Sequence, residues 1–367
     1  MRILAISPYH AGSHSRWLRE LKSQFPEHIW TTLTLPPRAF SWRYVGNAFS
    51  LYERHKAILS QNFDLILATS MTNLIALRGL LPKLAETRTV LYFHENQFFY
   101  PMQHANAERE RFHFSMQSVY AAMAADALVF NSEHNQHTFL EGVRGLLRKM
   151  PDHAPKKVVD RLTQRSRVLP VPIADIWFQT PNKKSGPLQI LWNHRWEYDK
   201  APERFFNALT QLYNSGQECV LHVVGQSFKT KPDCFLIAQK KLQPWIQTWG
   251  YLSDINAYQK LLMEADIVVS TSLHEFQGLS VLEAAASGCH ILAPHRLAYP
   301  EWFKGSSLYE SFPDDPDAEC DMLYGILDQH MRNPEHLRQQ SPPDISELRW
   351  AKCREGYERL LTEGLDS

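Results

Sequence analysis

Short apolar runs alternate along the chain with longer segments in which apolar residues recur every three or four positions. The short runs are almost wholly apolar, which is typical of strands buried on both faces of a parallel sheet. In the first half they are Ile3–Ile6, Asp64–Ala68, Val90–Phe93 and Leu128–Phe130. The segments between them have helical spacing, as at Trp17, Leu21 and Phe25. This alternation predicts a doubly wound α/β domain.

The same rhythm restarts after a polar stretch, 180–187, that has the composition of a linker. Strands are predicted again at Leu188–Trp192, Val220–Val224, Ile267–Ser270 and His290–Ala293. We therefore expect two Rossmann-like domains, 1–175 and 185–343, facing across a cleft at the carboxyl ends of their strands, where such folds bind ligands. The last periodic segment, within 344–367, has no strand after it, so we expect a helix that crosses back to the first domain.

Composition and charge limit the kinds of partner. The 367 residues suit two domains, and Lys+Arg and Asp+Glu balance at 39 each, so any polyanion must meet a local patch. The five cysteines form no CxxC pair and no zinc spacing, which indicates reduced thiols and no metal site. The sequence shows no signal peptide and no apolar run of roughly 20 residues. We expect a soluble, cytoplasmic protein without a membrane span.

The loop after the first strand, 7–14, lacks the GxGxxG pattern of dinucleotide-binding folds. Its one glycine, Gly12, permits a close backbone approach but does not make that fingerprint. A nicotinamide-dependent enzyme is therefore disfavoured.

The strongest candidate site follows the strand that ends at Ser270. The loop 271–278 leads into a helix that should begin at Leu279 or Ser280 and end at Gly288. The first amides of such a helix are unpaired and favour phosphate, and Gly278 keeps side-chain bulk away from them.

Charged residues surround this expected phosphate site. Glu275 and Glu283 lie on either side of it, where carboxylates can accept hydrogen bonds from sugar hydroxyls. Arg195 and Lys200 follow the first strand of the second domain and can stabilise a leaving diphosphate without a metal. Each pair alone also fits ordinary surface charge.

With these residues in place, the segment 250–288 resembles the E-x7-E donor motif of the retaining glycosyltransferases of family 4, which have the GT-B fold. The resemblance implies that Glu275 contacts the transferred sugar and Glu283 the ribose. It also implies that the amides near Leu279 and Ser280 hold phosphate, and that Arg195 and Lys200 stabilise the leaving diphosphate. The base pocket is expected near Gly250, Tyr251 and Leu252. The sequence departs from the family at Phe276 and Gln277, and in a first loop that keeps only Gly12.

A second set of residues belongs to the acceptor side. His94 lies at the carboxyl end of the predicted strand Val90–Phe93 and is followed by Glu95 and Asn96, and His14 lies in the first loop. The alternative interpretation is that His94 has a structural role. Together with 131–136, these segments resemble the narrower family of tRNA-queuosine α-mannosyltransferases. That resemblance implies GDP-mannose as the nucleotide-sugar donor, no cofactor, and the cyclopentenediol of queuosine in tRNA-Asp as the acceptor.

A basic segment, 144–167, is compatible with a tRNA partner. It holds eight Lys and Arg residues against two Asp, and we expect Arg161, Arg165 and Arg167 to contact RNA phosphates. A solvated surface is one alternative, and an anionic membrane is another, although the segment shows no amphipathic face with Trp or Phe.

The expected reaction is transfer with retention, in which the acceptor proton goes to the leaving phosphate. Three alternatives stay open from the residues: a family-4 transferase with another donor and a lipid or glycan acceptor, a nucleotide-sugar epimerase, and a non-catalytic binding module.

Overall fold

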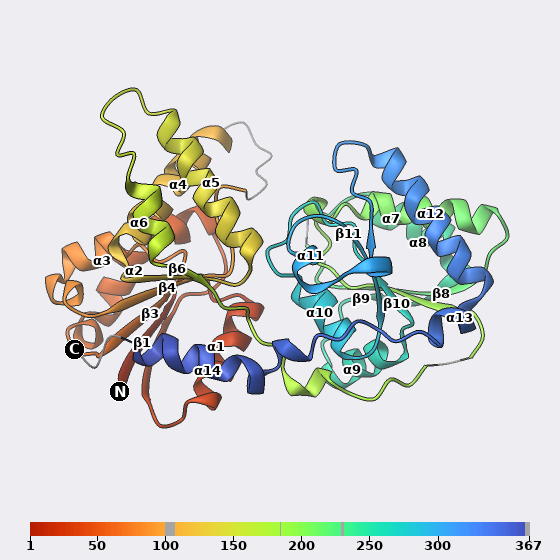
Figure 1. Ribbon diagram of the computed structural model, residues 1–367, viewed down its shortest axis with the longest axis horizontal. Coiled ribbons are helices and arrows are strands. Elements are labelled where there is room, and N and C mark those ends of the chain that lie inside the picture. Colours follow the sequence, from red (N-terminus) through yellow and green to blue (C-terminus); the bar gives the residue numbers. More distant parts are fainter. Residues whose placement is uncertain (100–106, 184, 229–230, 364–367) are drawn as a thin grey trace. The chain divides into compact units, whose positions relative to one another are not determined.

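The computed structural model describes residues 1–99, 107–183, 185–228 and 231–363 (Figure 1). The chain divides into two compact units: unit 1 is Met1–Pro172 with Ala351–Ser367, and unit 2 is Ile173–Trp350. Each unit is built around one six-stranded sheet in which all strand pairs are parallel.

Unit 1 has the strand order β2-β1-β3-β4-β5-β6. Its strands are β1 (Arg2–Ser7), β2 (Ile29–Thr34), β3 (Leu65–Thr69), β4 (Thr89–Phe93), β5 (Ala127–Phe130) and β6 (Ser166–Val168). Its helices are α1 (Gly12–Gln24), α2 (Phe40–Leu59), α3 (Leu74–Leu80), α4 (Ala107–Ala124), α5 (Glu133–Arg148), α6 (Val158–Gln164) and α14 (Trp350–Thr362), with a 3-10 turn η1 (Pro82–Ala85). The buried strands pack against α2 to α6 in an apolar core. A smaller apolar cluster in the same unit contains Tyr44, Met71 and Phe114.

Unit 2 has the order β12-β11-β10-β7-β8-β9. Its strands are β7 (Leu188–Trp192), β8 (Cys219–Val224), β9 (Ile246–Gly250), β10 (Ile267–Val269), β11 (His290–Pro294) and β12 (Leu308–Tyr309). Its helices are α7 (Pro202–Asn214), α8 (Cys234–Lys241), α9 (Ile255–Glu264), α10 (Leu279–Ala286), α11 (Tyr299–Trp302), α12 (Pro316–Arg332) and α13 (Pro334–Arg338). Its 3-10 turns are η2 (Asp175–Trp177), η3 (Tyr198–Lys200), η4 (Gln243–Trp245), η5 (Gly305–Ser307) and η6 (Ser346–Leu348). Two apolar clusters fill this unit.

All eight strands predicted from the sequence are present, each within about one residue of its predicted bounds. The four strands that the apolar pattern did not predict, β2, β6, β9 and β12, are the edge strands of the two sheets. Most of their residues are only partly buried, so they lack a continuous apolar run.

The chain returns to unit 1 through α14, which lies beside α1 (Figure 1). The buried hydroxyl of Tyr357 accepts a hydrogen bond from Nε1 of Trp17 at 3.0 Å and donates to the carbonyl oxygen of Pro170 at 3.0 Å. The helix begins at Trp350, within the predicted segment 344–367, and the 3-10 turn η6 precedes it.

Candidate active site

Two loops of unit 2 leave the same edge of the sheet side by side. Strands β7 and β10 are neighbours, and the chain order reverses between them, which makes this the switch point where open α/β sheets bind ligands. The loops 193–200 and 270–278 follow these two strands. The amide of Leu273 donates to the carbonyl oxygen of Asp199, and the hydroxyl of Thr271 donates to that of Lys200, both at 2.8 Å. The two loops therefore hold each other in place.

Lys200 and Glu275, one from each loop, form the centre of this site. Nζ of Lys200 lies 3.3 Å from Oε2 of Glu275 and 3.1 Å from Oδ2 of Asp199, and it donates to the carbonyl oxygen of His274 at 2.6 Å. Lys200 is buried, whereas the Glu275 side chain is partly exposed. The structure thus brings together two residues that the sequence placed in the donor site, 75 positions apart.

Electrostatics keep this cluster ionised. Burial by itself would lower the pKa of Lys200, but the carboxylates of Glu275 and Asp199 outweigh it and raise that pKa. Burial would raise the pKa of Glu275 and of Asp199, but the ammonium of Lys200 lowers both below their usual range. The site therefore presents a permanent cation between two permanent anions.

Helix α10 starts directly after this cluster. It begins at Leu279, with Gly278 in the left-handed region (φ 82°) as its N-cap residue. A Cβ on Gly278 would lie 3.0 Å from the Tyr299 ring, so both the backbone angle and the space favour glycine. The helix ends before Gly288, which has φ 83°. The predicted helix start and its terminal glycine are both confirmed.

Arg195 and Glu283 lie near the cluster in different settings. The Arg195 guanidinium is about half exposed and pairs with Glu197 at 3.0 Å, and its charge acts on Lys200 and on Glu275. Glu283 is buried within α10.

The other predicted donor residues occupy the ends of β9 and the loop before α10. Gly250 ends β9 with φ 111°, and Tyr251 beside it is 69% exposed. Leu252 packs partly against one of the apolar clusters. Phe276 and Gln277, where the sequence departs from the family pattern, are both buried.

Two further residues of the β7 loop belong to the site although sequence reasoning did not assign them roles. Asn193 donates through Nδ2 to the carbonyl oxygen of Ser280 at 2.8 Å and so holds the first turn of α10. The His194 ring is buried, and among the described residues its Nε2 has no hydrogen-bond partner. Burial and the charge of Lys200 lower the pKa of His194 to about 3. The only sequence signal for either residue was its place beside Arg195.

The predicted acceptor residues of unit 1 form a cluster of rings at the end of β4. The rings of His14 and His94 stack with centroids 4.2 Å apart, and Nε2 of His14 lies 3.3 Å from Oε2 of Glu95. Trp17 packs edge-on against His94 at 4.7 Å. In the described part of the chain, Nε2 of His94 and Nδ1 of His14 are buried without a hydrogen-bond partner. Burial, with a contribution from His14 and His10, lowers the pKa of His94 well below its usual value.

Asn96, predicted to bind acceptor hydroxyls, already has hydrogen-bond partners within the protein. Its amide is buried, donates to Oδ1 of Asn135 at 2.9 Å and to the hydroxyl of Thr138 at 3.0 Å, and accepts from the amide of Phe98. These bonds hold the loop after β4, and a contact of Asn96 with the acceptor stays a prediction. Gly12 begins α1, and a Cβ at this position would meet no atom within 4 Å. No neighbouring atom of the protein therefore makes the close approach to the backbone that was inferred for Gly12.

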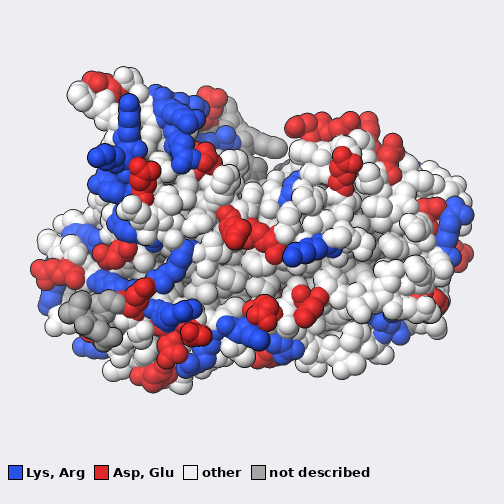
Figure 2. All heavy atoms as spheres, in the orientation of Figure 1, with Lys and Arg blue, Asp and Glu red and all other residues white. Residues whose placement is uncertain are grey.

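The basic segment lies on α5, α6 and the loop between them, where Figure 2 shows Lys and Arg gathered on unit 1. Two of the three arginines assigned to RNA are engaged within the protein. Arg165 donates to the carbonyl oxygen of Ala125 at 2.8 Å, and Arg167 pairs with Glu363. Arg161 is exposed. The other exposed cations of the segment are Arg148, Lys149, Lys156 and Lys157.

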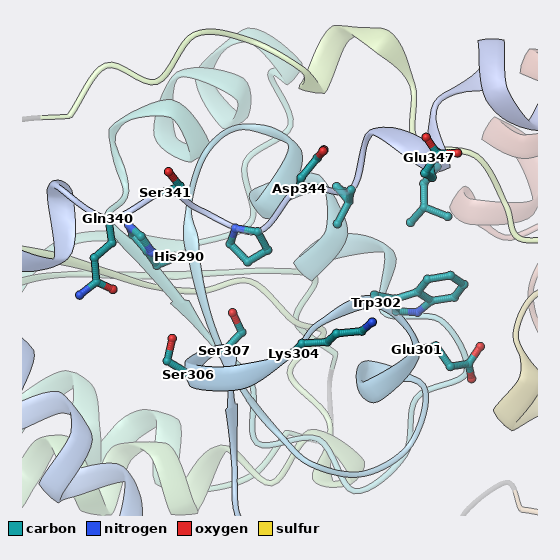
Figure 3. Close-up of a pocket in the computed structure, with 13 residues that line it drawn as sticks. His290, Glu301, Trp302, Lys304, Ser306, Ser307, Gln340, Ser341, Asp344 and Glu347 are labelled. Atoms are coloured by element: carbon teal, nitrogen blue, oxygen red, sulfur yellow. The ribbon is translucent and has the colours of Figure 1, made fainter.

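A separate pocket of about 590 Å³ in unit 2 is lined by the start of β11, η5 and the segment before α14 (Figure 3). None of the predicted donor residues lines it. In the ranges that the structure describes, no group of three or more His, Cys, Asp or Glu residues is arranged to hold a metal ion. No helix in those ranges is both long and apolar enough to cross a membrane.

Comparison with known proteins assigns the chain to a family. The family model for the N-terminal part of tRNA-queuosine alpha-mannosyltransferase matches residues 2–173, and that for glycosyl transferases group 1 matches 174–306. A tRNA-queuosine alpha-mannosyltransferase from Drosophila melanogaster is 31% identical over 321 residues, which are 84% of this chain and 83% of that protein. The chain belongs to the tRNA-queuosine α-mannosyltransferase family. It is a glycosyltransferase, and the resemblance drawn from the sequence is confirmed.

Solved structures support the fold. Sucrose-phosphate synthase from Thermosynechococcus elongatus aligns with a TM-score of 0.70 at 14% identity, covering 99% of each chain. Anabaena HepE, solved in complex with UDP and glucose, aligns with a TM-score of 0.65 at 14% identity, covering 99% of this chain and all of the other. The two parallel six-stranded units therefore make the expected GT-B fold.

Proposed function

We propose that this glycosyltransferase moves mannose from GDP-mannose to the cyclopentenediol of queuosine in tRNA-Asp, in the cytoplasm, with retention at the anomeric carbon. The observation that carries the proposal is the match to a relative named for mannose, queuosine and tRNA along 84% of the chain. The geometry of unit 2 supports the donor half of the reaction, and the histidine cluster of unit 1 supports the acceptor half.

In this proposal the switch-point loops of unit 2 bind the nucleotide sugar. The amides that open α10 receive the diphosphate, because they are unpaired and carry the positive end of the helix dipole. Lys200 and Arg195 offset the negative charge that grows on the leaving diphosphate. Glu275, held by Lys200, accepts hydrogen bonds from sugar hydroxyls, and Glu283 accepts them from the ribose. The unpartnered Nε2 of His194 is satisfied by the bound donor.

The reaction exchanges one bond at the sugar for another. The bond from mannose C1 to the phosphate oxygen breaks, and C1 bonds the acceptor oxygen on the same face. The acceptor proton passes to the departing phosphate oxygen, so GDP is the second product and no separate base is needed. We propose that no metal takes part, since two cations of the chain supply the positive charge. Full activity in EDTA is the expected result.

In unit 1, His14, His94 and Glu95 are proposed to bind the acceptor diol or the transferred sugar. Buried imidazole nitrogens without partners are costly unless a ligand satisfies them. Burial lowers the pKa of His94, and a neutral imidazole suits hydroxyl groups, which both donate and accept hydrogen bonds.

The proposal is tested by incubating the full chain with GDP-mannose and with tRNA that either contains or lacks queuosine. We expect a mannosylated nucleoside only from the queuosine-containing tRNA, with the α anomer shown by NMR. Equal transfer to both tRNAs would contradict the acceptor, and a β anomer would contradict retention. An epimer formed from donor alone would show a different reaction class.

A further inference from the structure

Helix α2 presents an apolar stripe to solvent. Trp42, Val45 and Phe49 are 53%, 42% and 60% exposed. Their spacing of three and four residues places them on one face of the helix. The opposite face is buried through residues such as Tyr44 and Leu51. Because the buried face already packs α2 against unit 1, the exposed stripe is not needed for that contact.

The indole of Trp42 lies against Gly46 of the same helix. A Cβ on Gly46, one turn further on, would lie 2.7–2.9 Å from three consecutive atoms of the six-membered ring. The ring therefore occupies the space that any larger residue at position 46 would need. All ten tryptophans lie in the described ranges, and Trp42 is the one classed as exposed. An aromatic ring that packs against its own helix and is still exposed to solvent is suited to stacking.

The stripe begins at the edge of unit 1 where the acceptor residues lie. Phe40, the first residue of α2, packs against Tyr9 with ring centroids 5.6 Å apart and against Phe114 at 5.9 Å. Tyr9 belongs to the loop between β1 and α1, the same loop that carries His10 and leads to His14. Trp42 thus lies two residues after Phe40, which contacts the acceptor-side loop through Tyr9.

Cations flank the stripe at both ends. Arg38 is exposed just before α2, and Arg43, partly exposed, follows Trp42. Arg54 and Lys56 are exposed near the end of the helix, where Glu53 is the one acidic residue of α2. Aromatic platforms interleaved with cations are the combination that binds single-stranded nucleic acid, because bases stack while phosphates are neutralised.

We propose that this stripe docks unpaired bases of the acceptor RNA, with Trp42 and Phe49 each stacking on one base. The inference rests on the proposed function, which supplies RNA as the acceptor, and it names a surface different from the basic segment on α5 and α6. Seven helical residues set the Cα atoms of Trp42 and Phe49 about 10.5 Å apart along the helix axis, which suits two bases turned out from a loop and not the stacked interior of a duplex.

The test compares Trp42→Ala, Phe49→Ala and the double variant with Trp42→Phe, which keeps an aromatic ring. Ile237→Ala is the matched control, since Ile237 is an equally exposed apolar residue on unit 2. We expect each alanine variant to weaken tRNA binding about 5- to 150-fold. KM for tRNA should rise, Trp42→Phe should retain most of the affinity, and the control and slow donor hydrolysis should be unchanged. Gly46→Ala, which displaces the indole without removing it, should give a smaller loss.

Fluorescence gives a second readout for the same surface. Acrylamide should quench Trp42 in the free protein, and tRNA should protect it, whereas the Trp42→Phe protein should show neither change. Unchanged tRNA affinity in the double variant would overturn the inference. The inference would also be overturned if the double variant lost binding to anionic vesicles, or lost self-association, while it still bound tRNA. The proposed function fails separately, if the wild-type chain does not glycosylate queuosine-containing tRNA.

Discussion

Lys200 is buried between the carboxylates of Glu275 and Asp199, and its ammonium stays charged at any physiological pH. A charge already fixed in place stabilises a leaving diphosphate without reorganisation when the bond breaks. We predict that Lys200→Ala and Arg195→Ala each lower kcat by about 100-fold or more.

Initial rates at saturating donor and tRNA measure this effect. Lys241→Ala is the matched control, because Lys241 is an exposed cation of unit 2. Retention of wild-type kcat in Lys200→Ala would remove Lys200 from the catalytic assignment. A fall in the control as well would show a general effect of charge.

Substitution of His194 can distinguish a functional role of its imidazole from a structural one. A buried polar atom without a partner costs stability, and replacing the group by an apolar one of similar size can be neutral or stabilising. His194→Leu should therefore leave the urea midpoint unchanged or raised while lowering kcat/KM for the donor about tenfold, the worth of one hydrogen bond of about 1.4 kcal/mol. Lower stability with full activity would mean that His194 only supports the fold.

At the scale of the element, apolar runs predicted the interior strands because parallel strands covered on both faces must be apolar throughout. The edge strands β2, β6, β9 and β12 are partly exposed, so polar residues interrupt their pattern and hide them. Helix α10 was predictable to its ends because Gly278 and Gly288 mark positive backbone angles.

The candidate site was predictable only in part. Residue types and loop positions indicated Lys200 and Glu275, but their contact depends on β7 and β10 being neighbours, which only the sheet order fixes. The stacking of His14 on His94 is likewise a tertiary contact with no local signal. The hydrogen bonds of the Asn96 side chain to Asn135, Thr138 and Phe98 are tertiary or loop contacts that residue type and position did not predict.

The basic segment on α5 and α6 leads to a prediction about salt. Since Arg165 and Arg167 are engaged internally, the exposed cations Lys149, Lys156 and Lys157 are better placed to meet phosphates. Changing these three to Gln should weaken tRNA binding and reduce the slope of log Kd against log salt by up to about 0.9 for each lost phosphate contact on paired RNA. Donor hydrolysis should not change. A slope equal to that of wild type would place the RNA elsewhere.

For the whole molecule, buried neutral histidines make stability depend on pH. Burial holds the pKa of His94 well below its usual value and lowers that of His194 to about 3. In the unfolded chain each of these histidines takes up a proton near pH 6.5, whereas in the folded chain it does not. Protonation therefore favours the unfolded chain, so the stability present above pH 6.5 is lost as the pH falls. The free energy of unfolding should drop by up to about 1.4 kcal/mol per pH unit for each such histidine.

Urea midpoints measured from pH 7.5 to pH 5 check this slope. His194→Leu should flatten it, whereas His153→Gln should not, because the His153 side chain is 94% exposed. Equal midpoints at the two ends of the range would contradict the neutral, buried state of these rings.

The proposed reaction joins a GDP-mannose donor to a queuosine acceptor on one chain. The most direct measurement incubates queuosine-containing tRNA-Asp with GDP-mannose, UDP-glucose, UDP-galactose or GDP-fucose in turn, followed by digestion and nucleoside mass spectrometry. We expect a hexose to be added to queuosine with GDP-mannose alone, and this addition to be lost in Lys200→Ala. Transfer from a UDP-sugar in place of GDP-mannose, or unmodified queuosine with every donor, would contradict it.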